Sequence, residues 1–335
     1  MTPDPVLPAD VQALPHGIWA VDTGFHRPRF DAAYLIVEQG RAAFVDTGTN
    51  FAVPRLLGAL AAVGLAPEAV DWLIVTHVHL DHAGGAGLLM QSLPNARLVV
   101  HPRGARHMID PGALVEGARA VYGDAEVARS YGVLAPVPEG HVLTTHEGMS
   151  LDLAGRPLQI IDTPGHARHH HAVWDARSRG LFTGDSFGLS YREFDVDGRA
   201  WMSATTTPVQ FEPEPLKASV RRMLALGPQW LYLTHFGRVG DVLRLAGMLL
   251  EQVDSMVALA WRCQGTGPKR QAGLMRGLGE LYLRSLRDHG CRLGDEVVLE
   301  LLALDIELNA QGLAIWLDRQ DRPEASLGVH RQQAR

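Results

Sequence analysis

Residues 75–85, with the sequence VTHVHLDHAGG, constrain this chain more than any other segment. Within six residues they contain His77, His79, Asp81 and His82. Imidazole is a poor core filler and a weak helix former, so this density calls for a functional reason. The apolar run DWLIVT at 71–76 comes first and predicts a short strand buried on both faces. Because α/β sheets place ligands at the carboxyl ends of their strands, we expect these side chains at a binding site.

The spacing of these side chains suits two metal ions. His77 and His79 are two residues apart, so an extended backbone points them the same way. Asp81 and His82 follow where the chain turns towards a predicted helix. One bend thus offers nitrogen ligands to one ion, and a carboxylate with a nitrogen to a second. The alternative is a polar surface loop, which the position directly after a buried strand disfavours.

Three further segments end a predicted strand with a histidine or an aspartate. They are IIDTPGH with His166, LFTGD with Asp185 and LYLTH with His235. Four strand ends that deliver such side chains to one rim are hard to explain by packing. The set is sufficient for two metals that share a carboxylate. Imidazole and carboxylate without thiolate suit Zn²⁺, and also Fe or Mn.

The order of predicted elements indicates an α/β fold of four layers, αββα. Strands, a helix near 54–63 and further strands in the first half are followed by the same theme in the second half. From about Gly240 the pattern becomes helical. We therefore predict a catalytic domain at 1–240 and a helical C-terminal extension at 241–335, which serves packing, the substrate pocket or a homodimer surface.

The composition of the chain limits the classes of binding partner that we expect. No window approaches the ~18 unbroken apolar residues of a membrane span, and the N-terminus has neither the basic start nor the apolar core of a secretory signal. Cys263 and Cys291 are too few to staple a chain of 335 residues. The net charge is −6 without a long basic block. We expect a cytoplasmic enzyme with a small-molecule substrate and neither nucleic acid nor membrane as partner.

The ordered motifs resemble those of the metallo-β-lactamase superfamily. They are THVHLDH at 76–82, GH at 165–166, GD at 184–185 and His235, with FVDTG at 44–48 as an early strand and turn. The resemblance covers roughly residues 15–240. It implies the fold above and a division of ligands: His77, His79 and His166 for one metal, and Asp81, His82 and His235 for the other. It also implies that Asp185 bridges the two and that Asp81 orients a bridging hydroxide and relays its proton.

The motifs are specific for the fold and the metal site but only weakly specific for the substrate. From the full ligand set, the helical C-terminal part and the acidic chain we expect a binuclear metal-dependent hydrolase that acts on a small ester-like substrate, a thioester or a lactone. The glyoxalase II branch of the family uses a helical C-terminal part in substrate binding. The superfamily also contains phosphodiesterases and mononuclear iron dioxygenases that act on persulfides. A ligand-binding regulator with weak catalysis is a further alternative. The intact second ligand set argues against a single metal.

Candidate substrate contacts come from two segments. The loop after Asp185 is long, and its Tyr191 and Trp201 either line a pocket or cover the core. In TPGHARHHH at 163–171, His169 stands where the family has a glycine, and His170 is either structural or a substrate contact. The sequence Val-Asp-Thr-Gly occurs twice, as in aspartic proteases, but the copies are too close together for paired lobes. We therefore expect Asp46 to be a buried aspartate that bonds loop backbone.

Overall fold

The computed structural model describes residues 7–206, 209–263 and 265–320, so residues 321–335 of the predicted extension lie outside it. The first half of the chain forms a seven-stranded mixed sheet in sequential order. Its strands are β1 (Val11–Leu14), β2 (Ile18–Asp22), β3 (Ala32–Glu38), β4 (Arg41–Val45), β5 (Val70–Ile74), β6 (Arg97–Val100) and β7 (Val142–Thr144). The pairs from β1 to β4 are antiparallel, and those from β4 to β7 are parallel.

The second half forms a six-stranded sheet in the order β13-β12-β11-β10-β9-β8. Its strands are β8 (Ser150–Leu153), β9 (Arg156–Asp162), β10 (His171–Asp175), β11 (Gly180–Phe182), β12 (Trp230–Leu233) and β13 (Gly237–Val239). Strand β10 is antiparallel to both β9 and β11, and β11 is parallel to β12. Strands β9, β11 and β12 therefore run in one direction and end at one edge.

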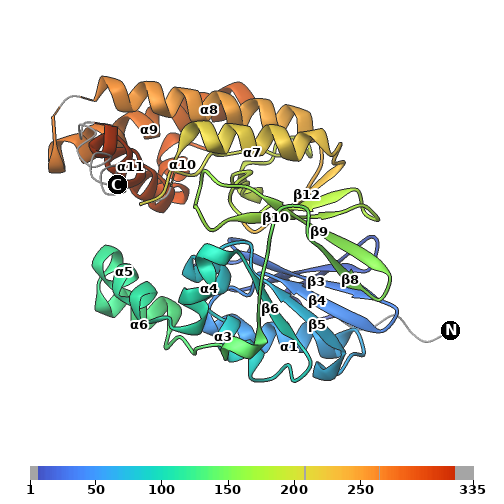
Figure 1. The fold of residues 1–335 in the computed structure, drawn as a ribbon. Helices are drawn as coiled ribbons and strands as arrows, with labels where there is room; N and C mark the ends of the chain where they lie inside the picture. Colours follow the sequence, from blue (N-terminus) through green and yellow to red (C-terminus); the bar gives the residue numbers. More distant parts are fainter. Residues whose placement is uncertain (1–6, 207–208, 264, 321–335) are drawn as a thin grey trace, which may run out of the picture.

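Helices cover the outer faces of the two sheets, and the sheets face each other (Figure 1). The helices are α1 (Val53–Ala62), α2 (Leu80–Ala83), α3 (Ala86–Met90), α4 (Pro102–Ile109), α5 (Gly112–Tyr122), α6 (Asp124–Tyr131), α7 (Pro213–Ala225), α8 (Val242–Arg262), α9 (Gly267–His289), α10 (Asp295–Leu301) and α11 (Ala303–Gln320). Tyr34 and Ile36 of the first sheet pack with Phe182 of the second in the layer between the sheets. The predicted αββα sandwich with C-terminal helices is confirmed.

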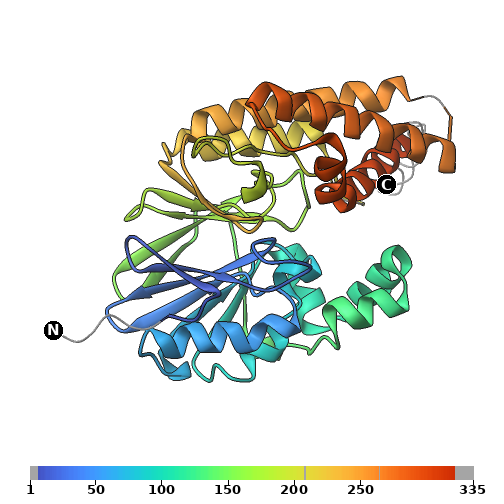
Figure 2. The same cartoon turned by 180° about the vertical axis from the view of Figure 1, so that it is seen from behind.

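The C-terminal helices share one core with the second sheet. Leu249 of α8 and Leu278 of α9 belong to the same buried cluster as Leu231 of β12. Figure 2, from behind, shows α7 and α8 along the outer side of this sheet, with α9–α11 beside them. The helical pattern predicted from about Gly240 onwards forms α8 to α11, and α10 and α11 are separated at Leu302. No helix in the described residues is long and apolar enough to cross a membrane.

Candidate metal centre

Four of the predicted ligands lie directly after β5. His77 and His79 stand in the loop at the carboxyl end of this strand, and Asp81 and His82 lie in the short helix α2. His77 and His82 are fully buried, whereas the side chain of Asp81 is 24% exposed. The predicted turn from strand to helix thus brings all four side chains to one edge of the first sheet.

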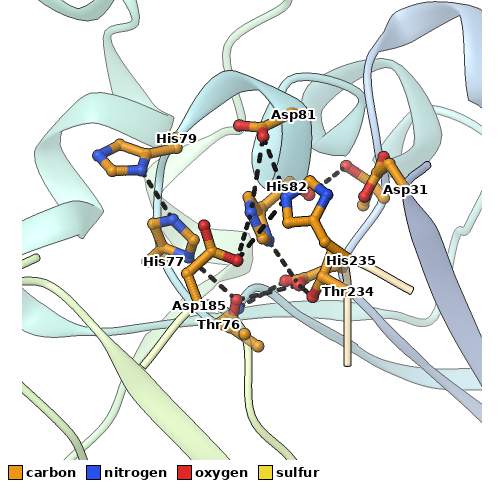
Figure 3. A network of polar contacts seen from close by, with 12 residues as sticks. Asp31, Thr76, His77, His79, Asp81, His82, Asp185, Thr234 and His235 are labelled. Carbon is orange, nitrogen blue, oxygen red and sulfur yellow. Dashed lines mark hydrogen bonds and ion pairs between the residues drawn. The ribbon is translucent and has the colours of Figure 1, made fainter. Parts of the chain in front are cut away.

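The other three predicted ligands come from the second sheet. His166 follows β9, Asp185 follows β11 and His235 follows β12. Because these strands end at the same edge, their side chains meet the β5 loop between the sheets. Figure 3 shows Asp185 and His235 pointing towards His82 and Asp81. The structure thus brings together all seven residues predicted as ligands.

The histidines His77, His79 and His166 form the first group. The Nε2 atom of His77 lies 2.8 Å from Nδ1 of His79, and Nε2 of His166 lies 3.1 Å from the same atom. Burial lowers the pKa of His77 well below its usual range, that of His79 to about 3 and that of His166 to about 4. The imidazoles are therefore neutral at physiological pH, which is the form that binds metal.

Asp81, His82 and His235 form the second group, and Asp185 connects the two groups. Oδ2 of Asp81 lies 3.4 Å from Nε2 of His235 and 3.7 Å from Nε2 of His82. Oδ1 of Asp185 lies 3.2 Å from Nε2 of His82, while its Oδ2 lies 3.5 Å from Nε2 of His166. One carboxylate therefore faces both groups, as the resemblance implies.

The electrostatics of the second group favour positive charge. Burial lowers the pKa of His235, but Asp185 and Asp81 raise it by more, to about 10. Burial likewise lowers the pKa of His82, yet the neighbouring carboxylates lift it well above its usual range. A buried set of carboxylates with this effect attracts a cation, either a proton or a metal ion.

The unsatisfied polar atoms of the centre fit a metal site. Nε2 of His82 and Oδ1 of Asp185 are buried and make no hydrogen bond of normal geometry within the described residues. Such atoms are rare in folded proteins, and a coordinated ion satisfies them. Three groups of this cluster have donor atoms within 4.8 Å of one another: His77–His79–His166, His77–His82–Asp185 and Asp81–His82–His235. The donor set is imidazole and carboxylate, which suits Zn²⁺, Fe or Mn.

Asp46 is hydrogen-bonded to three residues around the candidate metal centre. Its side chain accepts hydrogen bonds from the backbone N of Thr76 (2.7 Å), from Thr234 Oγ1 (2.9 Å) and from Nδ1 of His82 (2.9 Å). The bond to Nδ1 turns Nε2 of His82 towards the metal groups. The bond to loop backbone agrees with expectation, whereas the contact with His82 was not foreseen. In the sequence, the FVDTG motif at 44–48 is the feature that marks Asp46.

His170 contacts Asp185 and does not line the cavity beside the candidate metal ligands. Its Nδ1 contacts Thr163 Oγ1 at 2.8 Å, and its Nε2 accepts a hydrogen bond from the backbone N of Asp185 at 3.1 Å. A Cβ on Gly184, whose φ is +47°, would lie 2.5 Å from that Nε2. The glycine before Asp185 is thus required by close packing.

A cavity of about 380 Å³ lies beside the two groups of candidate metal ligands. His79, Asp81, Asp185 and His235 line its inner end. Much of the remaining wall is apolar and comes from the loop before β3, from α2, from α5 and α6, and from α11. It includes Phe25, Phe30, Leu80, Leu114, Leu304 and Leu308. Such a cavity suits a small substrate with an apolar part.

Of the predicted substrate contacts, Tyr191 lines the cavity and Trp201 does not. The hydroxyl of Tyr191 donates to Oδ1 of Asp305 in α11, at 3.2 Å. Trp201 is fully buried in the core of the second sheet, where its Nε1 donates to Ser285 Oγ at 3.0 Å. The large aromatic side chains of this loop could not be divided from the sequence into those that line the cavity and those that lie in the core.

Asp305 is a cavity residue that was not predicted from the sequence. Burial raises its pKa to about 6. Asp305 and Asn309 are polar residues four apart on the buried face of α11. That spacing on an otherwise apolar face was the available signal.

The fold is an α/β sandwich, and its donor set could hold metal ions. The sequence profile described as the metallo-beta-lactamase superfamily matches residues 26–235, more than half of the chain. The chain therefore belongs to the metallo-beta-lactamase superfamily, whose members are generally hydrolases that bind divalent metals.

Several proteins have sequences similar to about half of this chain or more. A metallo-beta-lactamase fold-containing protein of Sulfurisphaera tokodaii is 28% identical over 63% of this chain and 75% of its own length. A hydroxyacylglutathione hydrolase of Acidiphilium cryptum is 30% identical over 60% of this chain, and one of Stenotrophomonas maltophilia is 32% identical over 45%. The matches span 62% and 44% of those two hydrolases.

Solved structures share the fold over nearly the whole chain. A metallo-beta-lactamase family protein of Thermus thermophilus superposes with a TM-score of 0.64 at 23% identity, covering 92% of this chain and 95% of that one. An archaeal superfamily protein of Sulfolobus tokodaii superposes with a TM-score of 0.61 at 23% identity, covering 89% of this chain and 98% of that one. These likenesses concern the fold alone.

Proposed function

We propose that this chain is a binuclear metal-dependent hydrolase that cleaves a small thioester or lactone. The observation that carries the proposal is Asp185, whose two carboxylate oxygens face separate ligand groups at the end of a largely apolar cavity. The 30% and 32% identity to hydroxyacylglutathione hydrolases supports a thioester as the scissile bond. The cytoplasm remains our expected location.

His77, His79 and His166 would hold one ion, and Asp81, His82 and His235 the other, with Asp185 between them. When bound, two such ions polarise the scissile carbonyl and supply a nucleophile at neutral pH. Zn²⁺ is our first expectation, with Fe or Mn as alternatives. The neutral imidazoles of His77, His79 and His166 leave their lone pairs available near pH 7. His82 and His235, whose pKa values are raised, would release a proton when an ion binds.

Asp81 is the candidate proton acceptor. It lines the cavity, and its side chain is 24% exposed against 7% for Asp185. Burial raises the pKa of Asp81, but His82 and His235 lower it by more, so the carboxylate is ionised at neutral pH. An ionised carboxylate at the cavity wall can orient a water by accepting its proton in a hydrogen bond, and can relay that proton to the leaving group.

Substitution of two ligands tests the assignment. We expect His79→Ala and Asp185→Asn each to lose metal and hydrolysis together, because His79 joins the first group and Asp185 joins both. Metal per chain is measured by mass spectrometry, and initial rates with chromogenic thioesters and lactones. The control is Asp71→Asn, at a surface ion pair with Arg41. A variant that keeps both metals and the full rate would refute the ligand set.

A further inference from the structure

A second cavity, of about 410 Å³, adjoins the metal cavity and is lined largely by basic side chains. Its wall consists of Pro102, Arg103, Arg106, His107, Arg168, His169 and Gln210. Of these, His107, His169 and Gln210 also line the metal cavity. The two spaces are therefore neighbours with a common wall.

The arginines of this second cavity are only partly neutralised. Arg103 and Arg106 lie on α4, three residues apart, and both side chains are exposed. Within the described residues, no carboxylate lies at ion-pair distance from either guanidinium. Arg168 pairs with Glu212 at 2.6 Å. The concentration of positive charge runs against the net charge of −6 for the whole chain, which points to a local role.

The fold fixes this basic wall relative to the metal ligands. A Cβ on Gly104 would lie 2.7 Å from Cγ1 of Val78, so α4 lies directly against the loop that carries His77 and His79. His169 is 6% exposed, and its ring centroid is 5.7 Å from that of His79. The backbone N of Val78 contacts Nδ1 of His169 at 3.4 Å. His169 thus stands between the metal centre and the arginines.

We infer that Arg103, Arg106 and Arg168 form a subsite for an anionic group of the substrate, a carboxylate or a phosphate. Guanidinium groups bind both anions through paired N–H donors. This inference rests on the proposed function and deepens it, because the substrate becomes an anionic thioester. Its acyl part occupies the apolar cavity, and its charged end lies over α4.

Matched substrates test the subsite. Three thioesters of one thiol are compared: a neutral acyl chain, the same chain with a terminal carboxylate, and the same chain with a terminal phosphate monoester. The measured quantity is the ratio of kcat/KM for each anionic thioester to that for the neutral one. The double variant Arg103→Gln/Arg106→Gln is expected to lower this ratio by about tenfold for each arginine, as the loss of a charge-assisted hydrogen bond implies. The anion with the larger change identifies the source of the charge.

The control variant is Arg221→Gln, an exposed arginine of α7 that lines neither cavity. Its substitution removes one positive charge, as each of the two substitutions in the double variant does. It is expected to leave the ratio unchanged, and thermal unfolding of each variant checks that the fold is kept. An unchanged ratio in the double variant, or an equal fall in Arg221→Gln, would overturn the subsite.

Binding without turnover separates the subsite from the proposed reaction. Thioether analogues, with CH₂ in place of the carbonyl, are titrated calorimetrically into the metal-loaded protein. If the double variant binds the anionic analogues more weakly than the native chain does, and binds the neutral analogue equally well, the subsite is supported. This holds even if no thioester is hydrolysed, and in that case only the proposed function fails. Equal binding to the native chain and the double variant overturns the subsite even if thioesters are hydrolysed.

Discussion

Asp46 shows how one buried side chain can set the orientation of a candidate metal ligand, His82. It accepts hydrogen bonds from Thr76, Thr234 and His82, which belong to different parts of the chain. A carboxylate on the far nitrogen of a metal-binding histidine fixes both its tautomer and its orientation.

Asp46→Asn is therefore expected to weaken metal binding in the second group about 10- to 100-fold. The amide has only one acceptor oxygen, so it cannot accept all four hydrogen bonds, which come from the backbone N and Oγ1 of Thr76, from Thr234 Oγ1 and from His82 Nδ1. Competition with a chelator of known affinity measures the change, and Asp71→Asn serves as the surface control. Equal metal affinity in Asp46→Asn and the native chain would show that Asp46 has no part in orienting His82.

The residues predicted as ligands were accessible from sequence because each follows an apolar strand. The end of a strand can be predicted from a short stretch of sequence, and a histidine directly after an apolar run is easily seen. Asp305 and the arginines of α4 were not accessible in the same way. The spacing of Asp305 and Asn309 marks two polar positions on one face of α11. The sequence pattern does not show that this face, or the arginines of α4, lies at a cavity, because that depends on how the helices pack against other layers.

The second sheet contains a buried ion pair between two adjacent strands. Arg156 of β9 donates to Asp175 of β10, with 3.1 Å between Nε and Oδ1, and the two side chains are 1% and 0% exposed. Burial raises the pKa of Asp175, but the bonds from Arg156 lower it by more, so its pKa lies below the usual range.

Asp175→Asn is expected to destabilise the chain by about 3–5 kcal/mol at pH 7, because the buried Arg156 loses the carboxylate it is hydrogen-bonded to and keeps only Glu38, whose Oε2 lies 3.8 Å from Nη1 of Arg156. The folded pKa of Asp175 is lowered, so the contribution of the pair is complete above about pH 4 and is lost as the pH falls further. The gap between native chain and variant should therefore be equal at pH 7 and pH 5 and smaller at pH 3. Urea unfolding measures it; a gap that widens towards pH 3 would contradict this linkage.

Element boundaries were predicted least well where packing decides them. The run from residue 295 onwards is apolar at helical spacing, yet it forms two helices around Leu302. Residues 102–140 contain the helices α4, α5 and α6. The strands β5, β9, β11 and β12 were predictable because each is a short apolar run between turn residues.

At the scale of the whole molecule, the C-terminal helices complete both the core and the cavity. Leu216 of α7 and Leu233 of β12 belong to one cluster with Leu249 of α8, and Leu304 of α11 lines the cavity. The division at residue 240 remains a prediction. The shared core suggests that residues 1–240 depend on the helices that follow.

A chain that ends at residue 240 is expected to lack cooperative unfolding and to bind a hydrophobic dye, because one face of the second sheet becomes exposed. Calorimetry and dye fluorescence compare it with the full chain. A monomeric 1–240 fragment with a sharp unfolding transition would instead establish an independent catalytic domain.

The central claim is that this chain binds two metal ions and uses them in hydrolysis. The most direct test is the metal content of protein purified without chelator, measured per chain beside thioester hydrolysis by the same sample. We predict two divalent ions per chain and a rate that falls with metal content when a chelator is added. A single iron per chain, with oxidation of a persulfide and no hydrolysis of thioesters or lactones, would contradict it.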